Sequence, residues 1–106
     1  MRYNMETAPA RERKNLHMKA IVTVIGKDRV GITADVCSLL AQRNINILDI
    51  TQTVLQGYFT MVMMVDTSAC EQSIAELTDI LHQAGEEQAL SIRIQREDIF
   101  EAMHRI

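Results

Sequence analysis

The chain has 106 residues, of which 47% are hydrophobic and 24% are charged. These proportions are typical of one soluble globular domain, and they exclude a wholly disordered chain or two separate cores. The net charge of -3 excludes a general binder of the nucleic-acid backbone, which draws its affinity from clustered Lys and Arg. No apolar run is long enough for a membrane span or a signal peptide, so we expect a cytoplasmic protein without a membrane partner.

The first 17 residues differ from the rest of the chain. They contain the only proline, Pro9, and they show no sustained apolar period. We therefore interpret residues 1–17 as a flexible N-terminal extension and residues 18–106 as the folded domain.

The first part of the domain predicts a strand followed by a helix. Residues 19–25 are rich in β-branched side chains and are followed by Gly26, which predicts a buried strand that ends there. From Ile32 the apolar side chains recur at the spacing of a helix that is buried on one face. Arg43 suits the negative end of a helix and Asn44 tolerates the left-handed conformation, so the helix is predicted to close there.

The middle of the domain predicts a β-hairpin. Residues 45–56 read as a strand in which Ile47 and Asp49 are expected on the same side. Gly57 separates this run from a second β-rich run at residues 58–65, and two strands joined by a short glycine-containing turn form a hairpin.

The last part predicts a second helix and a fourth strand. Ser68 and Glu71 have the spacing of a capping box, and Gly85 is the expected stop of the helix that follows them. Residues 90–94 alternate between apolar and polar side chains, as in a strand with one solvated face. A short amphipathic C-terminal helix is predicted from Glu97 onward.

The order strand, helix, strand, strand, helix, strand predicts an α+β, ferredoxin-like βαββαβ plait. In this fold a four-stranded antiparallel sheet carries both main helices on one face. The uncovered face also reads as apolar, because residues 61–65 contain no polar break and Ile21 and Ile25 flank further apolar residues. Soluble monomers rarely expose such a patch, so we predict a homodimer, formed by sheet-edge or sheet-face contact.

The fold hosts many functions, and each must be tested on its own residues. The first loop, GKDRVG, lacks the Cys-x-x-Cys pair of a metal carrier. Cys37 and Cys70 have no metal or redox spacing either, so we expect two buried or half-buried thiols, no metal and no cofactor. Tyr58 and Phe59 are the only aromatic residues on a predicted strand. RNA-binding sheets stack bases on aromatic side chains, so we do not expect direct recognition of RNA.

Catalysis finds little support in the sequence. There is no nucleophile with a nearby base, no pair of loop carboxylates and no glycine-rich phosphate cradle, so we predict that the protein is not an enzyme. An acylphosphatase-like enzyme remains an alternative, because Arg29 and Asn46 suit a phosphate and a catalytic water. Against this alternative, Asp28 places a carboxylate where the phosphate would bind.

The run that begins IVTVIGKDRVGITADVC and reaches Asn46 resembles the amino-acid-binding ACT domain. The shared pattern is a first strand, a loop that ends at Gly31, a helix with spaced Leu, Ile and Val, and Asn-Ile at the start of the second strand. The continuation YFTMVMMVD and the ending DIFEAMHRI resemble the small stand-alone ACT proteins of the UPF0237 family, which are related to the glycine-cleavage repressor group. The resemblance covers residues 18–106.

The resemblance implies a regulatory module that binds an amino acid or a similar small metabolite at a dimer interface and acts on a partner protein in trans. Carried over by position, Asp28 and Asn46 are the loop and strand contacts to the ligand. The wall of the site is then formed by Gly26, Arg29, Val30, Gly31 and Ile32.

Elementary chemistry gives a reason for this assignment. Gly31 lets the backbone turn into the helix, whose first amides carry a partial positive charge that suits an α-carboxylate. Asp28 suits an α-ammonium group, and the Asn46 amide both donates and accepts hydrogen bonds. The alternative is a structural or interaction dimer without a ligand, in which Gly31 serves only to start the helix.

Overall fold

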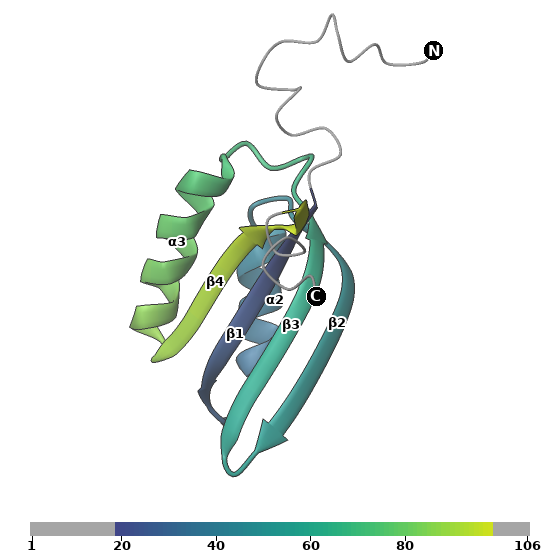
Figure 1. The fold of residues 1–106 in the computed structure, drawn as a ribbon. Coiled ribbons are helices and arrows are strands. Elements are labelled where there is room, and N and C mark those ends of the chain that lie inside the picture. Colours follow the sequence, from purple (N-terminus) through teal and green to yellow (C-terminus); the bar gives the residue numbers. More distant parts are fainter. Residues whose placement is uncertain (1–18, 99–106) are drawn as a thin grey trace, which may run out of the picture.

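The computed structural model describes residues 19–98 of the chain. The predicted extension and most of the predicted C-terminal helix lie outside these residues. Within residues 19–98, no helix is long and apolar enough to span a membrane. The elements, in chain order, are β1 (Lys19–Lys27), α2 (Ile32–Ala41), β2 (Asn46–Leu55), β3 (Tyr58–Asp66), α3 (Ile74–Glu87) and β4 (Leu90–Arg96) (Figure 1).

The four strands form one sheet in the order β2-β3-β1-β4, and every neighbouring pair is antiparallel. In the central pair Lys19 lies opposite Asp66 at one end, and Lys27 lies opposite Tyr58 at the other end. This element order and sheet topology confirm the predicted ferredoxin-like fold. They leave β2 and β4 as the two edge strands.

One face of the sheet forms the core with the two helices. Strands β1 and β3 alternate, so that Val22, Val24, Met61 and Met63 are fully buried on that face. They join the apolar stripes of the helices in one cluster. Fully burying side chains of this size contributes about 1.5–3 kcal/mol each, which is why period-two and helical patterns together specify the fold. The buried helical residues are Ile32, Val36, Leu40, Leu77 and Leu81.

The opposite face of the sheet is covered by neither α2 nor α3. Ile25 and Val62 lie on it and are 45% and 38% exposed, which confirms that apolar side chains occur on this face. The register places Thr23, Thr51 and Thr60 among them. The face is therefore more mixed than the sequence pattern predicted.

The predicted start of the second helix was wrong. The backbone N–H of Ser68 donates to the Asp66 carboxylate at 2.8 Å, so the local side chain stabilises a turn directly after β3. Helix α3 begins at Ile74, and its capping box is formed by Ser73 and Glu76 instead of Ser68 and Glu71, so the cap lies five residues later than predicted. A Ser/Asp turn competes with helix initiation for the same backbone groups.

Two predicted stops at glycine were also wrong. Strand β1 continues past Gly26 to Lys27, and α3 continues past Gly85 to Glu87. A Cβ at Gly26 would lie 2.5 Å from a Leu90 side-chain carbon, and a Cβ at Gly85 would lie 2.6 Å from the Leu90 carbonyl oxygen. Both glycines therefore allow close packing against the start of β4. Asn44, by contrast, adopts the predicted left-handed conformation, with φ 59°.

Strand β2 contains an irregularity that the alternation pattern did not predict. The register shifts between Ile47 and Asp49, so Leu48 is the extra residue of a β-bulge. Ile47 lies opposite Val65 and Asp49 lies opposite Met64. Asp49 is therefore on the face opposite to Ile47, not on the same face as expected.

Candidate functional site

The loop between β1 and α2 ends in an exposed helix start. Gly31 has φ 90°, and α2 follows it with no side-chain cap. The first intrahelical bond at this end runs from the Asp35 N–H to the Gly31 carbonyl at 2.9 Å. The N–H groups of Ile32, Thr33 and Ala34 precede that bond and have no intrahelical acceptor. They form the partly positive end of the helix.

The predicted loop residues are placed differently from one another. Asp28 is exposed, and its backbone N–H donates to the Gly57 carbonyl at 2.8 Å, which joins the loop to the β2–β3 turn. The Val30 side chain is 98% exposed, whereas the Ile32 side chain is 2% exposed in the core. Ile32 therefore offers only its backbone N–H to a ligand, and Gly26 lies within β1 and not in the loop.

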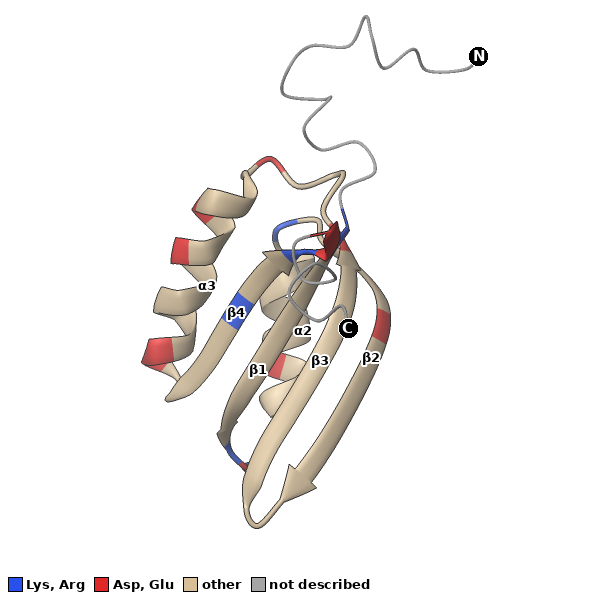
Figure 2. Ribbon diagram, viewed as in Figure 1, with Lys and Arg blue, Asp and Glu red and all other residues tan. Residues whose placement is uncertain are grey.

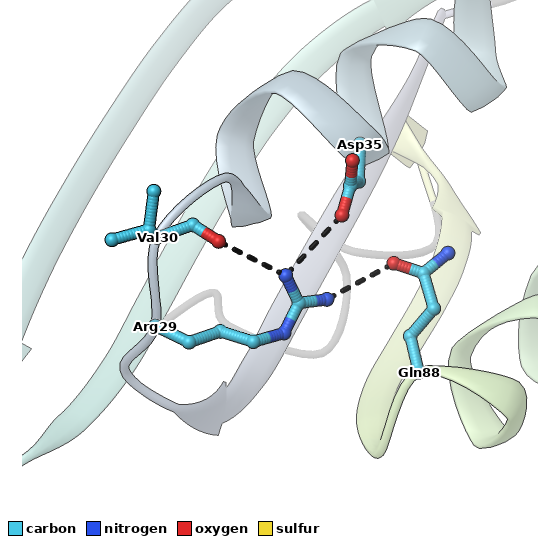
Figure 3. Close-up of polar contacts among 4 residues, drawn as sticks. All are labelled: Arg29, Val30, Asp35 and Gln88. Atoms are coloured by element: carbon cyan, nitrogen blue, oxygen red, sulfur yellow. Dashed lines mark hydrogen bonds and ion pairs between the residues drawn. The ribbon is translucent and has the colours of Figure 1, made fainter.

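Arg29 turns away from the hairpin and towards the second helix. One guanidinium nitrogen, Nη1, donates to the Val30 carbonyl at 3.3 Å and to the Asp35 carboxylate at 3.2 Å (Figure 3). The other, Nη2, donates to the Gln88 side-chain oxygen at 3.1 Å, in the turn between α3 and β4. Nothing in the sequence predicted this contact with Gln88, because the partners lie 59 positions apart.

A groove of about 810 Å³ opens beside this arginine, between α2 and the C-terminal end of α3. It is polar, and its carboxylates outnumber its single cation. The sequence predicted Arg29 as part of the ligand wall but did not predict the groove. The lining residues are Arg29, Asp35, Ser38, Leu39, Gln42, Glu86, Glu87, Gln88 and Ala89.

Asn46 is not brought together with the loop inside one chain. It is the first residue of β2 and lies opposite Asp66, at the end of the sheet away from Gly31. The ten residues of α2 separate the two ends by about 15 Å. One small ligand cannot span that distance, and the same separation keeps Arg29 and Asn46 from acting together on a phosphate within one subunit.

Strand β2 presents an apolar and almost uncharged edge. The hairpin of β2 and β3 carries Asp49 and Asp66 and no Lys or Arg (Figure 2). Edge strands of soluble proteins are usually protected by charges, prolines or bulges, and here only the bulge at Leu48 and the charge of Asp49 are present. The exposed apolar side chains of β2 are Leu48, Ile50, Val54 and Leu55, with exposed fractions of 45%, 40%, 53% and 70%.

The other reactive side chains give no second site in the described part of the chain. Cys37 is half-buried and Cys70 is buried, as predicted, and neither of these two cysteines is in a disulfide. Among residues 19–98, no three His, Cys, Asp or Glu side chains are grouped to hold a metal ion.

Comparison with known proteins identifies the class of domain. The family model of the ACT domain matches residues 19–95, which contain nearly all of the six elements. A solved ACT domain protein from Streptococcus pneumoniae is 44% identical, with a TM-score of 0.72, and the match covers 82% of this chain and 98% of that one. The protein is therefore an ACT domain.

A curated relative gives the particular family. A UPF0237 protein from Listeria innocua is 52% identical over 89 residues, which are 84% of this chain and the whole length of the relative. The chain belongs to the UPF0237 family. It is also similar to the structure of a candidate glycine cleavage system transcriptional repressor, at 26% identity and a TM-score of 0.63, over 74% of this chain and 45% of that one.

Proposed function

We propose that the protein is a regulatory ACT module that binds an amino acid or a similar small zwitterion between two copies of the chain and acts on a partner protein in trans. One observation carries the proposal. The uncapped start of α2 at Gly31 lies at the same end of the sheet as the β2–β3 turn, beside the apolar edge of β2.

The loop supplies complementary charges for a zwitterion. The free amides at the start of α2 suit an α-carboxylate, and the exposed Asp28 carboxylate suits an α-ammonium group. An exposed helix terminus stabilises an anion by only about 0.3–1 kcal/mol. Micromolar binding needs about 8 kcal/mol, so the loop alone forms an incomplete site.

A second copy completes the site through the β2 edge. If two β2 strands pair antiparallel about a two-fold axis, the first residue of one strand lies near the last residue of the other. Asn46 of the partner subunit then reaches the end where Leu55, Gly57 and the loop meet, because the Asp28 N–H already bonds to Gly57. The same pairing removes water from the loop and covers the apolar edge.

Light scattering and a pair of lysine variants test the dimer. We expect a mass twice that of the 12.0 kDa chain. Val54→Lys places a charge at the edge strand and should shift the mass towards that of one chain. Ile25→Lys is the matched control, because Ile25 is similarly exposed but lies on the open face of β1. If Ile25→Lys dissociates the dimer and Val54→Lys does not, the interface is the sheet face and the proposed site is wrong.

Isothermal titration with each of the twenty amino acids tests the ligand. For any amino acid that binds, Asp28→Ala and Asn46→Ala should each weaken binding by roughly 1–3 kcal/mol, the cost of losing one buried hydrogen bond. Mixing and reannealing the two variants should restore tight binding at a fraction of the sites. Each mixed dimer would hold one site with both side chains intact. A mixture that stays weak would contradict a site shared between subunits.

A dimer without a ligand remains the second candidate function, and the exposed apolar residues of β2 favour it. Dimerisation alone would cover Val54 and Leu55 and would leave the loop without a role. A dimeric mass together with no heat and no thermal shift for all twenty amino acids would select this candidate.

A further inference from the structure

The loop of residues 28–31 is held from two sides. On the hairpin side, the Asp28 N–H donates to the Gly57 carbonyl at 2.8 Å. On the helix side, the Arg29 guanidinium reaches Gln88 at 3.1 Å, in the turn that joins α3 to β4. The loop therefore lies between the proposed ligand edge and the groove beside α3.

The helix-side connection is reinforced by backbone packing. Gly26, two residues before the loop begins, pairs with Leu90 in the register of β1 and β4. A Cβ at Gly26 would lie 3.3 Å from the Ala89 carbonyl oxygen, so the two chain segments are already in close contact. Ala89 itself has φ 58°, a left-handed conformation that a non-glycine residue adopts at some cost. A backbone shift at the loop end of β1 would therefore also displace the turn between α3 and β4.

Arg29 is the side chain that can transmit such a shift. Its planar guanidinium bonds at once to the Val30 carbonyl, the Asp35 carboxylate and Gln88, whereas a lysine ammonium lacks this planar fork. The Arg29 side chain is 38% exposed and that of Asp35 is 50% exposed. Bonds at this exposure are individually weak, so they can break and re-form during a loop movement.

We propose that Arg29 is a positioning residue, not a ligand contact: it couples the loop of residues 28–31 to the α3–β4 turn, so that ligand occupancy changes the groove between α2 and α3. The loop cannot close over a ligand without moving Val30, and Arg29 is bonded to the Val30 carbonyl. The Gln88 contact must then shift with it or break. Because Gln88 lines the groove, the shape of the groove would then depend on whether the site is occupied. The ligand part of this inference rests on the proposed function.

The coupling itself is tested first without any ligand. Coupling between two sites is reciprocal, so each variant should act at the other's location. In amide hydrogen exchange, Gln88→Ala should speed exchange at Asp28 and Asp35, whose N–H groups bond to the Gly57 and Gly31 carbonyls, and Arg29→Gln should speed it at residues 88–90, each by about fivefold or more. Arg29→Lys should give a smaller change than Arg29→Gln. If neither variant alters exchange at the distant segment, the coupling is wrong.

Two matched controls separate coupling from general loosening. Gln83→Ala removes an exposed glutamine from the same helix, and Arg93→Gln removes an exposed arginine from β4. Both should leave exchange at Asp28, Asp35 and residues 88–90 unchanged. If these controls speed exchange as much as Gln88→Ala and Arg29→Gln do, the effect is global and the proposal fails.

Titration with each of the twenty amino acids then tests the regulatory part. For an amino acid that binds the natural sequence, Gln88→Ala should change the affinity by about fivefold, although Gln88 lies outside the proposed site, and Gln83→Ala should not. The affinity should rise if the Arg29–Gln88 contact breaks on binding and fall if the contact is kept in the bound state. An affinity of Gln88→Ala equal to that of the natural sequence would overturn this part. If no amino acid binds, the proposed function fails, and the exchange experiment alone still decides whether the loop and the turn are coupled.

Discussion

Helix α2 starts at Ile32 behind a left-handed Gly31 with no side-chain cap, whereas α3 starts behind a reciprocal cap between Ser73 and Glu76. In that cap the Glu76 N–H donates to the Ser73 hydroxyl at 3.2 Å, and the Ser73 N–H donates to the Glu76 carboxylate at 3.2 Å. The two helices pack on the same sheet face, and the buried side chains of both join one core cluster. The first N–H groups of α3 are therefore partly satisfied by its own cap, whereas those of α2 are available to a ligand.

The two helices also differ in how closely they contact the sheet. Helix α3 lies against the start of β4 at Gly85, close enough that no Cβ fits there. Near its start, α2 is joined to β2 by an exposed side-chain bond, from the Thr33 hydroxyl to Gln52 at 3.0 Å, while Ile32 is buried in the core. Close backbone packing therefore marks the end of α3, and free amides mark the start of α2, which is the end that the proposed function assigns to a ligand.

The close packing of α3 against β4 is tested at Gly85. Gly85→Ala would place a Cβ 2.6 Å from the Leu90 carbonyl oxygen, and overpacking against backbone typically costs about 1–3 kcal/mol. Alanine has a higher helix propensity than glycine, which offsets up to about 1 kcal/mol of this cost. The Cβ would meet a backbone atom, which cannot rotate away, so the overpacking cost lies at the upper end of its range and the net loss is about 2 kcal/mol in the free energy of unfolding, measured in urea at fixed protein concentration. Glu86→Ala, at the exposed next residue, is the control and should change stability by less than about 0.5 kcal/mol.

The functional side of the comparison is tested at Gly31, with Gly57 as a matched control. Both have positive φ, 90° and 82°, and both have open space where a Cβ would be added. Gly31→Ala and Gly57→Ala should therefore each cost about 1 kcal/mol of stability from the left-handed conformation alone. Gly31→Ala should also weaken an amino-acid ligand in titration more than Gly57→Ala does, because the free amides of α2 follow Gly31 directly. Equal effects of both variants on the ligand would mean that Gly31 contributes nothing beyond its backbone conformation.

Sequence patterns were sufficient for the fold because burial at periods of two and 3.6 residues involves many side chains at once. They failed where one local group outweighed the pattern. Ser68 and Glu71 had the spacing of a capping box, but the Ser68 N–H donates to the Asp66 carboxylate instead of to Glu71. Gly85 looked like a stop signal, but its role depends on Leu90, which meets it only after the chain has turned.

The candidate site was predictable in its residue types but not in its arrangement. The glycine-ended loop and Asn46 could be identified from the sequence, because each has a local signature. The distance between the loop and Asn46 is set by β2, which begins at the end of the sheet away from the loop. The contact of Arg29 with Gln88 is set by the turn between α3 and β4. Neither relation has a signal along the chain, since both arise from the packing of distant segments.

The cap of α3 provides the next test of the difference between the two helix starts. Ser73→Ala removes the acceptor for the Glu76 N–H, and losing such a cap costs about 1 kcal/mol. We expect this loss in the free energy of unfolding, with no change in the affinity of any amino-acid ligand. A loss of ligand affinity would show that α3 also takes part in the site.

Thr33 gives the smallest expected effect and the most direct check on α2. Its hydroxyl donates to Gln52 on the surface, and an exposed hydrogen bond of this kind contributes about 0.5 kcal/mol. Thr33→Ala should therefore lower the free energy of unfolding by about half as much as Ser73→Ala. The backbone N–H of Thr33 is retained in this variant, so a ligand bound by the first amides of α2 should keep its affinity. A stability loss equal to that of Ser73→Ala would show that a side chain does anchor the start of α2, and the contrast between the two helices would then disappear.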